Sequence, residues 1–449
     1  MTEPRRFGPV SEPERIASLD LLRGFALLGI FVVNIQFFSM PFGEMFSPAV
    51  YRGGPVADLV AWGFTKTLFE YKFISLFSLL FGAGMVMQMT RARQRGRPFV
   101  PVYLRRMLVL FLIGLAHGFF LWYGDILSGY AALGTVLLLA RNWRPRTMLI
   151  TSGSIIAFFC VIQLGIGIAV FAFKDRPDAA VEQTSEAMEA EATETEDDEP
   201  WSESNPNLAA RYPWLAAMFD SKLDLTSDRW RDAETKAYKE GPLIDASAFR
   251  AFTYLLVIFA GVFGYDWRVL AMFLIGAAFM KLGVFQPGRS RGHVRLFVLG
   301  FAVGLPLELA TTWLMFHGMG GERFDLAMMG AACHEAGSLS MCLGLVGAAG
   351  LIVTGGVMRR AVTALSAVGR LALSNYLLQT VVTTFLMYWW GLGWFGDLTR
   401  PSQIVLVLTI YGLQIPLSVL WLRVFTIGPM EWIWRPLTYL SPQPMRRAR

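Results

Sequence analysis

The 449-residue chain has little charge and few residues that bind metals. Only 16% of its residues are Asp, Glu, Lys or Arg, while 54% are hydrophobic. Because soluble chains carry about 25% charged residues, this composition excludes a water-soluble globular protein. The three cysteines lack CxxC spacing, and His334–Glu335 opens a zinc-like HEAGS without the second histidine, so we expect no metal site.

Known nucleotide and esterase motifs are also lacking. The chain contains no P-loop, no Rossmann glycine pattern and no GxSxG elbow. Its net charge of +6 comes largely from arginines between apolar runs. That pattern is typical of membrane topology, and it argues against nucleic acid as a partner.

Long apolar runs are abundant. A helix of about 20 apolar residues is long enough to cross a bilayer. The runs in this chain therefore predict an all-α, polytopic membrane bundle. We expect ten spanning helices, located at 24–43, 73–90, 107–124, 126–140, 147–173, 265–285, 296–316, 336–358, 371–396 and 401–422.

The region 251–285 is ambiguous, because Asp266 and Arg268 divide two short apolar runs. With the N-terminus cytoplasmic and one crossing here, fifteen Lys and Arg fall in the inner loops and five in the outer loops. Two crossings would invert every later loop and destroy this positive-inside bias. We therefore expect both termini to be cytoplasmic and 251–264 to be a surface or re-entrant helix.

An acidic insert interrupts the apolar pattern. The stretch from Glu182 to Glu199 is dense in Glu and Asp and offers no core, which predicts a disordered linker. Trp201, Trp214 and Trp230 follow among alternating charges and suggest amphipathic helices at the outer surface. The expected units are residues 1–173 with five spans, an extracytoplasmic insert at 174–247, and residues 248–449 with five more.

Two apolar runs repeat one polar spacing. Asn34 lies eleven residues beyond Arg23, and His117 lies eleven beyond Arg106, which places each pair on one helix stripe about 16 Å apart. His117 is a candidate general base, and Asp125 is near enough to orient its ring. The alternatives are a packing histidine and an aspartate that caps the next helix, and the two roles of Asp125 are compatible.

Further polar residues could line a cavity. Arg23, Arg106 and Arg370 stand at inner helix ends, either as phosphate ligands or as positive-inside anchors. The carboxylate of Glu308 is a functional candidate because charge is rare inside membranes. Asn375, Gln379 and Tyr376 lie together on one helix and either join helices or contact substrate.

Several motifs carry a family resemblance. They are LDLLRGFALLGIFVVNI, FISLFSLLFGAGM, HGFFLWYGDILSGYAALG, FLIGAAFMKLGVF, GRLALSNYLLQT and GPMEWIWRPLTY. In this order they resemble the YeiB-type bacterial inner-membrane proteins, and residues 272–439 resemble the domain of unknown function in which those proteins end. The family is similar to a group of membrane acyltransferases that includes heparan-alpha-glucosaminide N-acetyltransferase.

The resemblance implies a function. It implies that a cytoplasmic acyl-CoA gives its acyl group to a sugar or similar acceptor across the membrane. One branch of that group has Arg-x10-His in its first helix, where this chain has Arg23 and Asn34. We therefore expect His117 to act as the base and Asn34 to donate a hydrogen bond to the thioester carbonyl. Because both lie at similar depth, we expect the two side chains to border a common pocket.

The other interpretation is a transporter or lipid flippase in which the same polar residues line a path. For either function we expect a multi-pass protein of the bacterial inner membrane whose partners are lipid and small molecules. A homodimer is an assembly left open.

Overall fold

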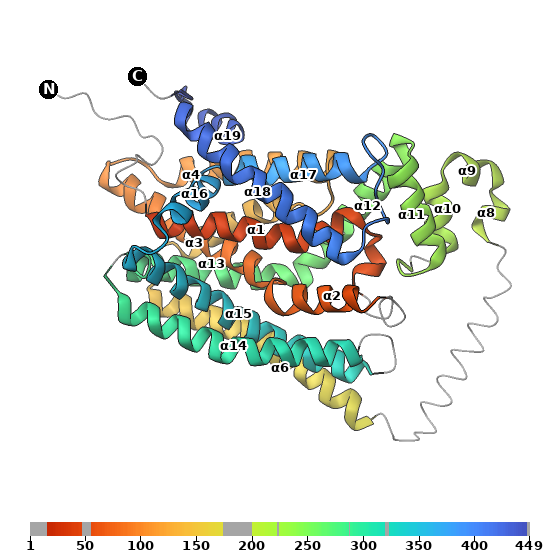
Figure 1. Cartoon of the computed structure of the whole chain (residues 1–449), viewed down its shortest axis with the longest axis horizontal. Helices are drawn as coiled ribbons and strands as arrows, with labels where there is room; N and C mark the ends of the chain where they lie inside the picture. The colour runs from red at the N-terminus through yellow and green to blue at the C-terminus, as the bar shows by residue number, and fades with distance from the viewer. Residues whose placement is uncertain are drawn as a thin grey trace.

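A computed structural model describes residues 16–46, 55–173, 200–221, 224–286, 288–318 and 323–446. The described residues are all-helical apart from one isolated bridge between Phe425 and Arg446. The expected linker from Glu182 to Glu199 lies outside them. The long helices run side by side, with α8–α11 at one end of the bundle and α19 at the other (Figure 1).

The helices before the insert are α1 (Ala17–Ser39), η2 (Phe42–Phe46), α2 (Val56–Leu68), α3 (Lys72–Gln94), α4 (Val100–Phe120), α5 (Leu127–Leu137), η4 (Leu138–Ala140) and α6 (Pro145–Phe173). Those of the insert are α8 (Trp201–Ser204), α9 (Pro206–Arg211), α10 (Pro213–Asp220) and α11 (Asp228–Glu240). The remainder are α12 (Leu243–Phe263), α13 (Tyr265–Leu282), α14 (Ser290–Gly318), α15 (Phe324–Gly355), α16 (Arg359–Arg370), α17 (Ala372–Met387), α18 (Arg400–Val424) and α19 (Pro429–Tyr439).

The described residues contain eight helical segments that are long and apolar enough to cross a membrane, or nine if the bent pair α16–α17 is one span. The eight are α1, α2 with α3, α4, α6, α12, α14, α15 and α18. The chain is therefore an all-α polytopic membrane protein. The expected span at 126–140 corresponds to a shorter apolar helix that starts at Leu127.

The region 243–282 differs from our expectation. α12, which contains the supposed surface segment 251–264, is long and apolar enough to span, whereas α13 is not among the candidate spans. α12 ends at Phe263, just before Gly264. Its apolar side chains, such as Phe259 and Phe263, are exposed. α13 holds Asp266, Arg268 and Lys281, yet it is buried at the centre of the bundle. Charge distribution could not reveal that protein, and not lipid, surrounds Arg268.

Glycines let α3 and α13 approach closely. A Cβ on Gly82 would overlap the carbonyl oxygen of Phe273, and one on Gly276 would overlap that of Leu79. Small residues at such crossings replace side-chain contacts with backbone packing, as is common in membranes. Since α3 precedes the insert and α13 follows it, the two parts of the chain share one core.

Close backbone contacts at glycines also join α1 to α16. A Cβ on Gly24 would overlap the carbonyl oxygen of Leu365, and one on Gly369 would overlap that of Asp20. On the next face, the Tyr411 hydroxyl donates to the Gly24 oxygen at 2.6 Å. The arginines next to these glycines, Arg23 and Arg370, are thereby brought to the same crossing.

The insert helices pack onto the end of the bundle. Trp230 of α11 is buried between Phe249 and Phe252 of α12, with ring centroids 5.1 and 5.4 Å away. The carboxylate of Glu234 accepts a hydrogen bond from the Phe42 amide at 3.1 Å. The insert therefore contributes a packed cap in addition to the acidic stretch.

Both ends of α17 are held by other segments. At its start, the Glu431 carboxylate accepts from the amides of Leu373 at 2.9 Å and Ser374 at 3.3 Å. Just beyond its end, the Trp389 amide donates to the Tyr238 oxygen at 2.7 Å. A neighbouring helix thus supplies the cap that the sequence of α17 lacks.

Candidate functional site

A cavity of about 230 Å³ lies among α1, α3, α4, α5, α16, α17 and α19. Five arginines are among its lining residues: Arg23, Arg91, Arg106, Arg370 and Arg435. Two carboxylates, those of Asp20 and Glu431, also line it. Five of the six motifs quoted above contribute lining residues, and the exception is FLIGAAFMKLGVF.

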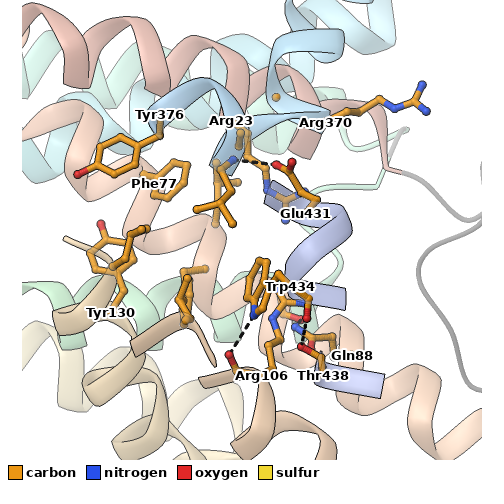
Figure 2. A pocket seen from close by; sticks show the side chains of 18 of the residues that line it. Arg23, Phe77, Gln88, Arg106, Tyr130, Arg370, Tyr376, Glu431, Trp434 and Thr438 are labelled. Atoms are coloured by element: carbon orange, nitrogen blue, oxygen red, sulfur yellow. Dashed lines mark hydrogen bonds between the residues drawn. The ribbon is translucent and has the colours of Figure 1, made fainter. Parts of the chain in front are cut away.

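The polar end of the cavity is built by helix termini. Arg91 lies in the last turn of α3, Arg106 in the first two turns of α4, and Arg23 in the first two turns of α1. Figure 2 shows Arg23, Glu431, Trp434 and Arg106 along one side, while the Arg370 side chain extends away from them. Arg23 pairs with Asp20 at 3.2 Å, and the Arg106 guanidinium stacks 4.2 Å from the Trp434 ring centroid.

The deeper part of the cavity is aromatic and aliphatic. Phe77, Tyr130 and Tyr376 stand on the opposite side in Figure 2. Aliphatic residues such as Leu27 and Leu110 also line the cavity. The Tyr130 hydroxyl already has a partner within the protein, because it forms a hydrogen bond with the Ser78 hydroxyl at 2.6 Å. The cavity therefore combines a cationic end with an apolar interior, which suits a ligand with an anionic head and an apolar body.

Glu431 fastens α19 to this cavity. Besides its bonds to the start of α17, it accepts a short hydrogen bond from the Ser374 hydroxyl, and Ser374 in turn accepts from the Met430 amide at 3.0 Å. Burial raises the pKa of the Glu431 carboxyl, and the hydrogen bonds it accepts oppose that shift. α19 also anchors to α4, since Trp434 donates to the Arg106 oxygen at 3.1 Å.

Next to the cavity lies a hydrogen-bonded series of three side chains. His117 Nδ1 is 2.9 Å from Asp125 Oδ1, and its Nε2 is 2.9 Å from the Thr380 hydroxyl. Because a carboxylate only accepts, Nδ1 carries the hydrogen and Nε2 accepts from Thr380. Asp125 Oδ2 also accepts from the Ser128 amide at 2.9 Å, so one aspartate both orients the ring and caps α5.

This series is closed off from the cavity by one layer of side chains. His117, Asp125 and Thr380 are all buried, and none lines the cavity. Tyr376 separates them, since it lines the cavity and its ring centroid lies 5.2 Å from that of His117. The imidazole thus stands behind the deep wall of the cavity.

The other residues proposed from sequence fall into several groups in the structure. Arg23, Arg106, Arg370 and Tyr376 line one cavity. Asn34 is half-buried on α1 and does not line it.

Asn375 and Gln379 face α18, where they donate to the Ser418 hydroxyl at 3.0 Å and to Gln414 Oε1 at 2.9 Å. Both therefore join α17 to α18. Glu308 is buried elsewhere, against Lys72 and His334.

Sequence reasoning missed Thr380, Glu431, Trp434 and Arg435. Thr380 lies four residues beyond Tyr376 on the same helix face. The sequence therefore already placed a hydroxyl group beside a residue that was predicted to contact substrate. Glu431 and its neighbours lie in GPMEWIWRPLTY, a motif quoted only for its resemblance.

Known proteins match this chain along nearly its whole length. A family described as "Protein of unknown function (DUF418)" matches residues 279–441. The chain is 31% identical to "Uncharacterized protein YxaH" of Bacillus subtilis (strain 168), covering 98% of each chain. It is 29% identical to "Uncharacterized protein YeiB" of Escherichia coli (strain K12), covering 96% of this chain and 98% of that one. No solved structure matches the chain.

Proposed function

The chain belongs to the DUF418 family of membrane proteins that contains YeiB and YxaH, and from that premise we propose that it is an integral-membrane acyltransferase. Its relatives' names give no activity, so the proposal is based on the cavity. The observation that carries it is the succession of arginines, an apolar interior and, outside the cavity behind Tyr376, a buried His117–Asp125 pair.

An acyl-CoA fits this succession. Arg23 and Arg106, with the neighbouring arginines, would bind phosphate oxygens through charge-assisted hydrogen bonds. The acyl chain would occupy the interior near Phe77, Tyr130 and Tyr376. Pockets for whole small molecules measure about 300–1,000 Å³, and this cavity measures about 230 Å³. The nucleotide would therefore remain outside the arginines.

The His117 series would supply the base. The acceptor hydroxyl or amine attacks the thioester carbonyl, its proton passes to Nε2 of His117, and CoA leaves as the thiolate. Asp125 keeps Nδ1 protonated and stabilises the imidazolium that forms. Thr380 occupies Nε2 in the resting state, so either the acceptor displaces its hydroxyl or Thr380 itself takes the acyl group first. Tyr376 has to move in both cases, because it closes the wall.

We propose that the arginine end of the cavity faces the cytoplasm of a bacterial inner membrane. The arginine-rich loops share that end: Arg93 donates to Asn142 at 3.3 Å, Lys281 to the Trp143 oxygen at 2.7 Å, and Arg105 to the Thr438 oxygen at 3.1 Å. Positive residues favour the cytoplasmic side.

Cysteine labelling of intact cells tests this orientation, in a background without the native cysteines. Asn207→Cys, in the insert, should react with an impermeant reagent, and Gln94→Cys, at the end of α3, should not. Labelling of Gln94→Cys in unbroken cells would overturn the orientation.

The activity itself is tested with purified protein in nanodiscs and radiolabelled acetyl-CoA or palmitoyl-CoA. Release of CoA thiol that depends on the protein and on an added amine or hydroxyl acceptor supports the proposal. Mass spectrometry of the trapped protein then separates the two routes, since an ester on Thr380 appears only if that residue takes the acyl group. Binding of neither acyl-CoA would overturn the proposal.

A transporter or lipid flippase is the second candidate, and the bent pair α16–α17 favours it. The two helices meet at 78° beside the cavity. Broken helices often build transport sites. In that case the cavity would bind the anionic lipid or solute that is moved, and acyl-CoA would not be cleaved. Movement of a fluorescent anionic lipid across proteoliposomes, without thiol release, would favour this candidate.

A further inference from the structure

A second group of ionisable side chains is buried away from the cavity. Lys72, Glu308 and His334 belong to three different candidate spans and are 0%, 0% and 3% exposed. Lys72 Nζ donates to Glu308 Oε2 at 2.5 Å, and His334 Nδ1 lies 3.0 Å from the same oxygen. None of the three lines the arginine cavity. Charged groups at such positions are costly and are a functional hypothesis by default.

Within the described part of the chain, two acceptor atoms of this group have no hydrogen-bond partner. They are Glu308 Oε1 and His334 Nε2. Since the carboxylate only accepts, Nδ1 of His334 carries its hydrogen, and Nε2 therefore presents a lone pair. A buried acceptor without a donor is destabilising, and a proton can bond to such an atom without displacing an existing hydrogen bond.

The surrounding charges cancel one another. Lys72 pairs with Glu308, Arg268 pairs with Glu335, and Lys66 pairs with Glu70 at 2.8 Å. With His334 neutral, the net charge of the group is zero, and one added proton makes it +1. The ionisable residues that surround Glu308 and His334 are Lys66 of α2, Glu70 and Tyr71 of the following turn, Lys72 of α3, Tyr265 and Arg268 of α13, and Cys333 and Glu335 of α15.

The turn before α3 is strained at this site. Tyr71 has a φ of 64°, a left-handed conformation that bulky residues rarely adopt. That backbone places its ring 4.7 Å from the His334 ring, centroid to centroid. An aromatic ring stabilises a nearby cation, so Tyr71 offsets part of the cost of an imidazolium. Strain kept beside a buried charge cluster points to function.

Hydrogen-bonded polar groups connect this cluster to a partly exposed carboxylate just beyond α2. The Lys72 ammonium also donates to the Lys66 oxygen at 2.8 Å, and Lys66 contacts Glu70, whose side chain is 29% exposed. Polar groups thus continue from a partly exposed carboxylate to Glu308 and His334.

We propose that Lys72, Glu308 and His334 form a proton-binding site inside the membrane. In the step, a proton from water bonds to His334 Nε2, and the hydrogen on Nδ1 stays directed at Glu308. The ring becomes an imidazolium between that carboxylate and the Tyr71 ring, and no other bond forms or breaks. The ligand is the proton itself. This site is independent of the acyltransferase proposal, because the two share no residue.

Histidine-labelled protein in nanodiscs tests the proposal by nitrogen NMR. The chain has four histidines, so His334→Gln identifies the signal of His334. We expect that ring to change from one neutral tautomer to the doubly protonated form at a pH at which the protein is still folded. Loss of the paired carboxylate in Glu308→Gln should lower the midpoint by about 1–3 pH units.

His293 is the internal control in the same spectra. It is equally buried, but its Nε2 donates to the Val284 oxygen at 2.8 Å and its partner is not a carboxylate. Its signal should be the same in the native protein and in Glu308→Gln. If Glu308→Gln does not fold, Lys72→Met removes the neighbouring cation and should raise the midpoint of His334. A His334 ring that stays neutral throughout the folded range, or a midpoint indifferent to these variants, would show an ion pair of structural use only and overturn the proposal.

Discussion

Gly24 and Gly369 stand against each other where α1 crosses α16: the Gly24 nitrogen lies 2.7 Å from the position that a Cβ on Gly369 would take. Gly24 follows Arg23 and Gly369 precedes Arg370, and both arginines line the cavity. The contact therefore sets the spacing between two walls of the proposed donor site.

Gly369→Ala is expected to separate α1 from α16. The added methyl would overlap backbone atoms that cannot move aside, and overpacking of this kind costs about 1–3 kcal/mol. We expect a lower melting temperature and weaker acyl-CoA binding. Gly412→Ala on α18, where a Cβ meets nothing within 4 Å, is the matched control and should leave both unchanged. Equal behaviour of the two variants would contradict the close crossing.

Arg23→Gln and Arg106→Gln should each weaken acyl-CoA binding. A hydrogen bond to a charged group contributes about 1.5–3 kcal/mol, so the dissociation constant should rise roughly 10- to 100-fold. Added salt should reduce the difference between variant and native protein. Calorimetry in nanodiscs measures both effects.

Arg93→Gln serves as the control for these variants. Arg93 is exposed on α3 and does not line the cavity. Its replacement removes a charge from the same end of the bundle, so a comparable loss of binding would mean that overall charge, and not the site, attracts the donor.

Thr380→Val and His117→Gln should impair acyl transfer to different degrees. Loss of the base lowers the rate about 10²–10⁴-fold in His117→Gln. If Thr380 takes the acyl group, Thr380→Val should lose as much turnover as His117→Gln. If Thr380 only positions the imidazole ring, the loss of turnover should be smaller and KM should change little. Thr383→Val is the control, because Thr383 is equally buried on α17 and its hydroxyl has no partner. Turnover unaffected in His117→Gln would exclude this base.

Stability should depend on pH through Glu234, which lies in the cap outside the spans. Burial raises its pKa from 4.5 to about 7. The folded chain therefore holds the proton more tightly than the unfolded chain does. Stability present below about pH 4.5 should be lost as the pH rises to about 7, by about 3 kcal/mol.

Thermal unfolding between pH 5 and pH 8 measures this dependence. Glu234→Gln, which cannot ionise, should flatten it, while Glu240→Gln at an exposed position of α11 should not. A slope that survives in Glu234→Gln would assign the dependence to another group.

Glu431→Ala should loosen the start of α17. The side chain caps two amides there, and loss of a cap costs about 0.5–2 kcal/mol. Hydrogen exchange at Leu373 and Ser374 should accelerate, whereas exchange at the far end of α17 should not. Unchanged exchange at both amides would mean that water replaces the carboxylate without cost.

The sequence predicted the helical membrane fold because uncharged runs report lipid directly. It also placed Arg23, Arg106 and Arg370 at inner helix ends, and these three residues line one cavity, because arginines at inner helix ends collect at one end of a bundle whatever the exact packing. The sequence did not indicate that Tyr376 would join them, since it grouped Tyr376 with Asn375 and Gln379.

Other features depend on packing that hydropathy does not record. α13 holds Arg268 inside the protein because Ser75, Ser338 and Glu335 satisfy it, and these partners come from two other helices. The shared spacing of Arg23 to Asn34 and Arg106 to His117 predicted a common pocket, but equal depth does not set the rotation of each helix. The cavity follows Arg23 and Arg106 and includes neither Asn34 nor His117.

The two fastenings of α17 make that helix a rod clamped at both ends. Glu431 fixes its first amides, and Tyr238 holds the chain just beyond its last turn. Thr380 and Tyr376 lie between the clamps, so neither can shift along the rod axis unless a clamp on α19 or α11 opens. Movements at either end of the bundle are therefore mechanically connected to the hydroxyl that contacts His117.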